Sequence, residues 1–490
     1  MEKRLFDTAV QQLKYEVIKE LIRAYDKGLD NSIFHDIPIK IMPGPQASLR
    51  CCVYKERAIL QERLKLAMGG NIDNPNVVEV IDIACDECPV DGLFVTPACR
   101  GCISHRCAEV CPKGAISIKD KRCVVDKEKC IECGKCTQAC PYNAIILQKR
   151  PCVLSCKANA IKVNADKKAV IDNSKCVGCG ACVYQCPFGA IQDKSYILDV
   201  LEMIKNSENN TKYKVYAIIA PSIVAQFNYA RIEQVITGMK LLGFDQVLET
   251  ALGADLTLNE EADELKEHGV LTTSCCPSFV KYVQINFPDL AKHISSTPSP
   301  MAMAGRLIKA MDPTAKVVFV GPCSSKKFEF KLETVKDYVD CVLSFEELQA
   351  FLDARDIDVS TLDDTYLDNA SYYGRIFARS GGITEGVTAL AEERGFEARP
   401  VAMSGLDECR KQLALLKAKR SPFNFFEGMA CDGGCVNGAL CLHHAPKSLT
   451  DVNKYGDMAK EKKVDNSVKL YKMALRAKAA AEQSDGGQND

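Results

Sequence analysis

Cysteine is the residue of this chain whose number and spacing point most directly to chemistry. The 490 residues include 27 cysteines, most of them between residues 85 and 186. In a short secreted chain this density would indicate disulfides. This chain is long, and it opens with charged and apolar residues at helical spacing rather than with the apolar core of a signal peptide. We therefore expect reduced thiolates that hold metal in a cytoplasmic protein.

Four repeats between residues 81 and 195 carry the dense cysteine pattern. Two have the spacing Cys-x2-Cys-x2-Cys-x3-Cys-Pro, one has four residues before its third cysteine, and one decayed copy keeps only two cysteines. In chain order the repeats are Cys99, Cys102, Cys107 and Cys111; Cys130, Cys133, Cys136 and Cys140; Cys152 and Cys156; and Cys176, Cys179, Cys182 and Cys186. Zinc sites use two separated Cys-x2-Cys knuckles, so this spacing predicts 4Fe–4S clusters instead.

In paired repeats of this kind, the cysteine before proline ligates the cluster of the other repeat. This crossing rule predicts three clusters, with ligand sets Cys99, Cys102, Cys107 and Cys140; Cys130, Cys133, Cys136 and Cys111; and Cys176, Cys179, Cys182 and Cys156. Cys152 and Cys186 are left over, together with the outlying pair Cys85 and Cys88. Two alternatives remain open: these four form a fourth cluster, or they are structural thiols.

Three further cysteine motifs lie in the second half of the chain. They are TTSCCPSFVKYV at 272–283, GPCSSKKFE at 321–329 and FEGMACDGGC at 426–435. From about residue 212, apolar runs of strand length, such as 213–220 and 316–320, alternate with stretches of helical periodicity. This alternation predicts an α/β domain with parallel sheets. The motif cysteines follow predicted strands, where α/β folds place their sites.

Together, the motifs resemble those of the FeFe (iron-only) hydrogenases, over about residues 80–445. The resemblance implies an α/β catalytic domain of the FeFe-hydrogenase large-domain type, preceded by α+β ferredoxin-like 4Fe–4S repeats. We expect an N-terminal helical segment at 1–80, with a proline-containing loop near 38–46 between two helices. Ferredoxin-like domains would occupy 81–195, the catalytic domain 212–446, and a charged helix and tail 447–490.

The resemblance also implies roles for individual residues. The four ligands of the cubane half of an H-cluster would be Cys276, Cys323, Cys431 and Cys435. Cys435 would also bridge to a di-iron subcluster that carries carbonyl, cyanide and an azadithiolate. Cys275 would exchange a proton with the bridgehead amine, Lys326 would hydrogen-bond one cyanide, and the Pro221-Ser222 loop would contact the other. Met429 would pack against the cluster.

A proton path is implied by the same resemblance, from Cys275 through Glu261, Ser295 and Glu264 to solvent. An unperturbed thiol has a pKa of about 8.5, so Cys275 can carry a proton near neutral pH. The residues alone leave a plainer alternative open, because Glu261 and Glu264 also fit a solvated helix face and Lys326 also fits a surface charge.

Three positions depart from the family pattern. Gly321 stands where the best-studied members have Met, Phe279 where they have Trp, and Met301 where Gln is common. These positions surround the predicted di-iron unit, so the departures indicate a divergent subgroup. The ligand set itself is intact.

These observations predict an oxygen-sensitive hydrogenase with an H-cluster and three accessory 4Fe–4S clusters, the fourth left open. A ferredoxin-like carrier would exchange electrons with it, and maturation proteins would insert the di-iron unit. The balance of 63 basic and 64 acidic residues gives no reason to expect nucleic acid binding. No apolar run is long enough to predict a membrane span. Two rivals remain, an iron–sulfur assembly protein and a hydrogen sensor of the same fold.

The other cysteines have no partner at ligand spacing. We expect Cys51 and Cys52 to be ordinary thiols, and we expect buried thiols at Cys123, Cys341, Cys409 and Cys441.

Overall fold

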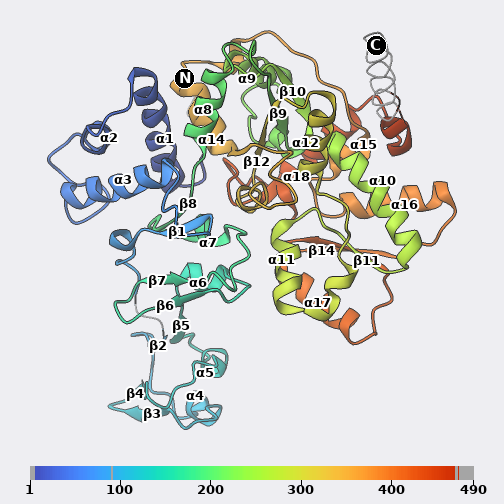
Figure 1. Ribbon diagram of the computed structural model, residues 1–490. Coiled ribbons are helices and arrows are strands. Elements are labelled where there is room, and N and C mark those ends of the chain that lie inside the picture. The colour runs from blue at the N-terminus through green and yellow to red at the C-terminus, as the bar shows by residue number, and fades with distance from the viewer. Residues whose placement is uncertain (1–5, 90–91, 470–472, 474–490) are drawn as a thin grey trace, which may run out of the picture.

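A computed structural model describes residues 6–89, 92–469 and 473. Three helices stand at the N-terminal end: α1 (Ala9–Lys27), α2 (Ile33–Ile41) and α3 (Val53–Ala67). Below them a column of small sheets extends away from the α/β lobe (Figure 1). The predicted loop near 38–46 was wrong in its first part, because α2 contains Pro38 and continues to Ile41. One proline costs a short helix a single internal hydrogen bond, and the apolar face of α2 packs into the core with Ile33 and Ile37.

Four antiparallel strand pairs build the column. The pairs are β1 (Val78–Val80) with β8 (Ile191–Asp193), β2 (Gly92–Val95) with β5 (Ile145–Gln148), β3 (Ile116–Lys119) with β4 (Arg122–Val125), and β6 (Ile161–Val163) with β7 (Ala169–Ile171). A short helix precedes the last cysteine of each repeat: α4 (Arg106–Glu109), α5 (Lys135–Ala139), α6 (Pro151–Ser155) and α7 (Ala181–Gln185); η1 (Asp82–Ala84) follows β1. Because β1 pairs with β8, the column begins a few residues before the boundary expected at residue 81.

Two parallel sheets form the lobe that follows α8 (Ile197–Asn206). The first has the order β10-β9-β12-β13, with β9 (Val215–Ile219), β10 (Gln246–Glu249), β12 (Lys316–Gly321) and β13 (Cys341–Ser344). The second has the order β11-β15-β14, with β11 (Leu271–Thr272), β14 (Pro400–Ser404) and β15 (Phe425–Met429). All the pairings in both sheets are parallel, which confirms the predicted sheet type.

Helices connect and cover these sheets. In chain order they are η2 (Pro221–Ala225), α9 (Ile232–Leu241), α10 (Thr250–His268), α11 (Pro277–Asn286), η3 (Pro288–His293), α12 (Pro300–Met311), α13 (Lys326–Glu329), α14 (Phe345–Ala354), η4 (Val359–Thr361), α15 (Tyr372–Ile376), α16 (Gly382–Arg394), α17 (Leu406–Lys417), η5 (Cys435–Asn437) and α18 (Ser448–Asp457). The predicted tail after 473 lies outside the described residues.

Helix α10 crosses closely against α12, and Gly253 makes that approach possible. A Cβ at Gly253 would lie 2.1 Å from the carbonyl oxygen of Pro300. Glycine inside a helix costs about 1 kcal/mol relative to alanine, so close packing explains its place here. The crossing holds the start of α12 beside the loop that carries Cys275. None of the helices in the described ranges is long and apolar enough to cross a lipid bilayer.

Candidate functional site

Three loops that leave the carboxyl ends of parallel strands meet around one cavity. The loop after β11 leads to Cys275, the loop after β12 leads to Cys323, and the loop after β15 leads to Cys431. Their shared position follows from the parallel order of the strands, whose carboxyl ends lie at one edge of each sheet. The cavity has an empty volume of about 850 Å³ and a largely apolar wall. The cysteines in that wall are Cys179, Cys275, Cys276, Cys323, Cys431 and Cys435.

The four expected cubane ligands therefore share one cavity. Burial, with the neighbouring Cys323, raises the pKa of Cys276 to about 11. Burial likewise raises the pKa of Cys435 to about 12 and that of Cys431 well above its usual value. Thiols crowded in this way resist ionisation until a metal takes the place of their protons. Four sulfur donors in the wall of one largely apolar cavity match a cubane in the number and kind of ligands that it takes.

No three His, Cys, Asp or Glu side chains in the described residues converge at the distances that a single metal ion needs. The ligand sets therefore rest on their shared environments and on sequence spacing.

The thiol of Cys275 is buried beside the cubane ligands. Burial raises its pKa well above the ordinary value, and Glu261 and Cys276 act in the same direction. Lys326 opposes them but does not reverse the shift. Cys275 therefore stays a neutral thiol, which can donate a proton into the cavity.

Lys326 is buried too, which excludes the alternative of a surface charge. Its Nζ donates to Glu329 Oε2 at 2.5 Å, to Ser299 Oγ at 3.0 Å and to the carbonyl oxygen of Cys275 at 3.2 Å. Burial alone would lower the pKa of Lys326, but Glu329 and the nearby thiols outweigh it and raise the pKa. The cavity wall thus contains a fixed cation next to Cys275.

The Pro221-Ser222 loop supplies a second polar group. Pro221 lines the cavity, and the buried Oγ of Ser222 has no hydrogen-bond partner among the described residues. An unpaired buried hydroxyl costs about 1–3 kcal/mol, so it is a sign that a polar ligand belongs nearby. Met429 lines the same cavity.

Glu261 and Glu264 both lie on α10. Glu261 is fully buried, which excludes a solvated helix face for this residue, and burial raises its pKa to about 8. Its Oε1 accepts from the backbone N–H of Ser274 at 3.1 Å, whereas its Oε2 has no partner in the described part of the chain. Half-buried Glu264 accepts from the backbone N–H and the hydroxyl of exposed Ser296.

The structure gives Ser295 and Ser296 different hydrogen-bond partners. The hydroxyl of Ser295 accepts from the backbone N–H of Thr297 at 3.1 Å, and the neighbouring Ser296 is the residue that contacts Glu264. A relay through Ser295 stays a prediction. Two adjacent serines cannot be told apart from sequence, because the loop conformation decides which hydroxyl faces the carboxylate.

The three departures from the family pattern lie at or near the cavity. Met301 lines it, and fully buried Phe279 packs against Gly428. A Cβ at Gly321 would lie 2.5 Å from the ring of Phe319, which itself lines the cavity. The Phe319 ring thus fills the space that a larger residue 321 would need.

Cys179, one of the predicted accessory-cluster ligands, lines the same cavity. The backbone of this cysteine loop is bonded to the motif loops: Ser324 Oγ donates to the carbonyl oxygen of Gly178 at 2.7 Å, and Ser278 Oγ to that of Val177 at 3.0 Å. Burial raises the pKa of Cys179 to about 12, with contributions from the surrounding thiols of Cys176, Cys156 and Cys276. The predicted set Cys156, Cys176, Cys179 and Cys182 thus lies against the cavity.

At the far end of the column, the surroundings of Cys136 agree with the crossing rule. Burial raises the pKa of Cys136, and the thiols that add to the shift are Cys130, Cys111 and Cys133. Cys123 is a buried thiol between the two cysteine sets, beside Cys107 and Cys99. Cys341, Cys409 and Cys441 are buried as expected.

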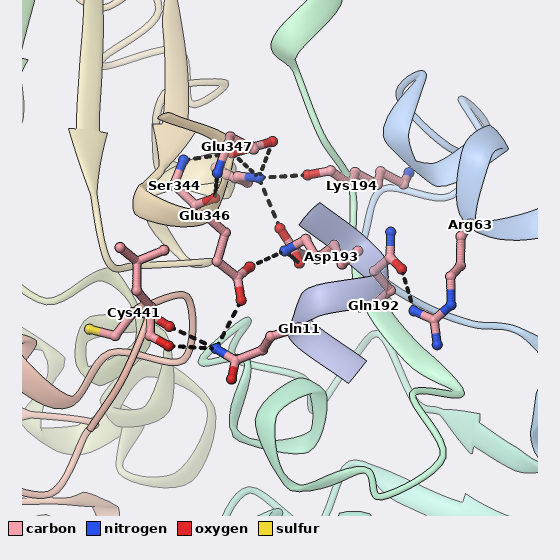
Figure 2. A network of polar contacts seen from close by, with 12 residues as sticks. Gln11, Arg63, Gln192, Asp193, Lys194, Ser344, Glu346, Glu347 and Cys441 are labelled. Atoms are coloured by element: carbon pink, nitrogen blue, oxygen red, sulfur yellow. Dashed lines mark hydrogen bonds and ion pairs between the residues drawn. The ribbon is translucent and has the colours of Figure 1, made fainter. Parts of the chain in front are cut away.

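A buried ionic network joins the column, the N-terminal helices and the cavity loops, and sequence reasoning missed it (Figure 2). Lys14 Nζ contacts Asp193 at 2.5 Å and Glu346 at 2.6 Å. Lys327, which follows Lys326 in the chain, contacts Asp193 at 2.9 Å and Glu347 at 2.8 Å. The only sequence signal is the second lysine of the motif, because the partners come from distant segments.

Family models match three parts of the chain. Residues 213–439 match "Iron only hydrogenase large subunit, C-terminal domain", residues 98–144 match a "4Fe-4S dicluster domain" and residues 169–192 match a "4Fe-4S binding domain". The lobe therefore has the large-domain fold of iron-only hydrogenases, and the column consists of ferredoxin-like 4Fe–4S domains. Both are as expected from the sequence.

Two of the relatives belong to different functional classes, one a hydrogenase and the other an iron–sulfur assembly factor. Iron hydrogenase 1 of Clostridium pasteurianum is 28% identical over 312 residues, which are 52% of this chain and 54% of that protein. Cytosolic Fe-S cluster assembly factor NAR1 of Eremothecium gossypii is 33% identical over 138 residues, 26% of this chain and 31% of that protein. The chain thus spans about half the length of the first relative. Among solved structures, the [FeFe]-hydrogenase HydA1 from Chlamydomonas reinhardtii aligns with a TM-score of 0.47 at 19% identity, over 56% of this chain and 93% of that chain.

Proposed function

We propose that this chain is an FeFe hydrogenase that catalyses the reversible reaction 2 H⁺ + 2 e⁻ ⇌ H2. The observation that supports it best is Cys275, a neutral buried thiol in the same cavity as the four cubane ligands. An H-cluster, when bound, supplies the redox centre at which electrons and protons combine. Cys276, Cys323, Cys431 and Cys435 would hold its cubane, with Cys435 bridging to the di-iron unit.

The chain's own residues would supply proton transfer and electrostatic stabilisation. Cys275 would hold and pass the proton, and Glu261, with a pKa near 8, would exchange it toward Glu264 and solvent. The Lys326 cation would stabilise one anionic ligand of the di-iron unit, and the unpaired hydroxyl of Ser222 would contact another. The apolar wall, which includes Met429, would exclude water from the centre.

Electrons would pass along the column of clusters to a ferredoxin or a similar carrier in the cytoplasm. Residues 98–148 at the far end carry nine basic and five acidic side chains, and all nine basic ones are exposed. This charge favours an acidic partner. Maturation proteins would insert the di-iron unit.

An iron–sulfur assembly role is the second candidate, because assembly factors are among the relatives. Such a protein needs the cubane ligands but no proton-carrying thiol. Glu261 and Lys326 both act on the Cys275 thiol, an arrangement that suits proton transfer, and this supports the hydrogenase over the assembly role. A sensor of H2 would retain the same site and differ by slow turnover.

The test is H2 uptake and evolution by the anaerobically matured protein, with a viologen dye as electron carrier. We expect turnover in the wild type and a loss of at least about 100-fold in Cys275→Ala, the size of a general acid–base contribution. Cys51→Ala is the matched control, because this thiol is exposed and remote from the cavity. No turnover by the wild type after competent maturation would leave the assembly role.

A further inference from the structure

The column contains the same strand plan twice. We call residues 92–148 the inner module; here β2 pairs with β5, and the β3–β4 hairpin lies between these two strands in the chain. We call residues 78–89 and 151–193 the outer module; here β1 pairs with β8, and the β6–β7 hairpin lies between these two strands in the chain. The whole inner module, residues 92–148, lies between Cys88 and Cys152 of the outer one. Figure 1 shows the inner module at the far end of the column, beyond the outer module from the lobe.

The short helices are duplicated in the same way as the strands. In the inner module, α4 packs against α5, and these helices contain the third cysteines of their repeats, Cys107 and Cys136. In the outer module, α6 packs against α7, and these contain Cys152 and Cys182. Cys152 therefore stands in the place of a third cysteine. Its first and second cysteines should precede the inserted module, where Cys85 and Cys88 follow η1.

Hydrogen bonds to sulfur support this equivalence at Cys85. In the inner module, a backbone N–H in the second hairpin strand, that of Cys123, donates to the first cysteine, Cys99, at 3.4 Å. In the outer module the corresponding strand donates from Ala169 to Cys85 at 3.3 Å. Arg150 adds a contact from its Nη1 to Cys85 Sγ at 3.8 Å.

The last cysteines of the repeats also share one geometry. Each accepts a hydrogen bond from the backbone N–H of the alanine four residues later, at 3.2–3.4 Å: Ala115 to Cys111, Ala144 to Cys140, Ala160 to Cys156 and Ala190 to Cys186. The copy that reads as decayed in sequence therefore has the sulfur geometry of the intact ones.

The remaining thiols converge on one place. Cys85, Cys152 and Cys186 are buried in a single apolar cluster. The ionisable groups that act on the Cys152 thiol are Cys186, Cys85 and Cys88, which places these thiols near it. The four thiols left over by the crossing rule are thus neighbours.

We propose that one dicluster module is inserted within another, between the second and third ligands of a fourth accessory 4Fe–4S cluster held by Cys85, Cys88, Cys152 and Cys186. The third repeat is then complete, with its first two cysteines displaced upstream by the insertion. The four accessory clusters form a single file from the inner module to Cys179 at the cavity. Each accepts and passes one electron, and no covalent bond is made or broken.

The test is a count of irons and sulfides on the full chain, purified anaerobically without di-iron maturation, by native mass spectrometry. Five cubanes give about 20 irons and 20 sulfides per chain, and four cubanes give about 16 of each. A mass that corresponds to four cubanes after complete reconstitution would overturn the proposal. The count does not depend on H2 turnover, so this inference and the proposed function can fail separately.

A pair of double variants assigns the fourth cluster to its ligands. We expect Cys85→Ala with Cys88→Ala to lose about four irons, and Cys51→Ala with Cys52→Ala, an equally large loss of thiols at exposed positions, to lose none. Unchanged far-ultraviolet circular dichroism checks that each variant folds. Equal iron in the two double variants would also overturn the proposal.

Discussion

The cavity and the inner module use the same side chain in opposite settings. The cavity collects its cysteines from loops that are far apart in sequence and surrounds them with apolar side chains. The inner module takes its cysteines from one short stretch and leaves some of them open, with Cys133 exposed. Chemistry that must exclude water needs a site built by the whole fold. Electron exchange with a partner needs a cluster near the surface, and a local loop is enough.

Removing one cysteine ligand from each region should have the largest effects, and these effects should differ between the two regions. Cys435→Ala should abolish H2 turnover, because it removes the proposed bridge between cubane and di-iron unit, while the accessory clusters remain. Cys133→Ala should cost one accessory cluster and leave a functional cavity. Iron content and dye-linked turnover on matured protein measure both effects, and equal turnover losses would contradict the distinction.

The contact between the outer module and the α/β lobe depends on buried charges. Lys14→Met leaves Asp193 and Glu346 without one of their cations, and removal of one partner of a buried pair costs about 3–5 kcal/mol. Anaerobic urea denaturation measures the loss. Lys336→Met removes an exposed pair with Glu333 and is the matched control, with an expected change below about 1 kcal/mol. Equal midpoints for the two variants would refute a structural role for the network.

The buried carboxyl of Glu261 should make the protein less stable as the pH rises. The pKa of buried Glu261 is raised to about 8, above its ordinary 4.5, so unfolding releases a proton between these pH values. The free energy of unfolding then falls as the pH rises through this window, by about 1.4 kcal/mol per pH unit.

Glu261→Gln does not titrate, so its stability advantage over the wild type should grow from pH 5 to pH 8 and then level off. Its H2 turnover should fall. Melting temperatures across pH 5–9 test this, with Glu333→Gln as the exposed control. Parallel curves for wild type and Glu261→Gln would contradict the raised pKa.

Charge reversal at the far end should have the smallest effect. Lys119→Glu with Lys121→Glu should slow reduction by an acidic ferredoxin by up to about tenfold, with the difference shrinking at high salt. Dye-linked turnover should stay unchanged. A ferredoxin rate that does not respond to either charge or salt would place the docking surface elsewhere.

Local patterns explain what the sequence could predict. The spacing of the cysteines from Cys130 to Cys140 predicts a cluster-binding loop, because these ligands are close together in the chain. The alternation of apolar strands and helices is enough to predict parallel sheets. The roles of Cys275 and Lys326 came from family resemblance, and the structure adds their burial and contacts.

Long-range placement explains what could not be predicted. Lys14 meets Asp193 and Glu346 only in the folded chain. The inserted module separates Cys88 from Cys152, so their repeat reads as decayed. The choice between Ser295 and Ser296, and the Phe319 ring beside Gly321, depend on local backbone direction.

Infrared spectroscopy of the anaerobically matured protein tests the central claim most directly. Carbonyl and cyanide stretching bands that shift under H2 would establish a working di-iron unit in the cavity, and in Cys275→Ala the shift should disappear while the bands remain. An absence of such bands from the wild type after competent maturation would contradict the hydrogenase account.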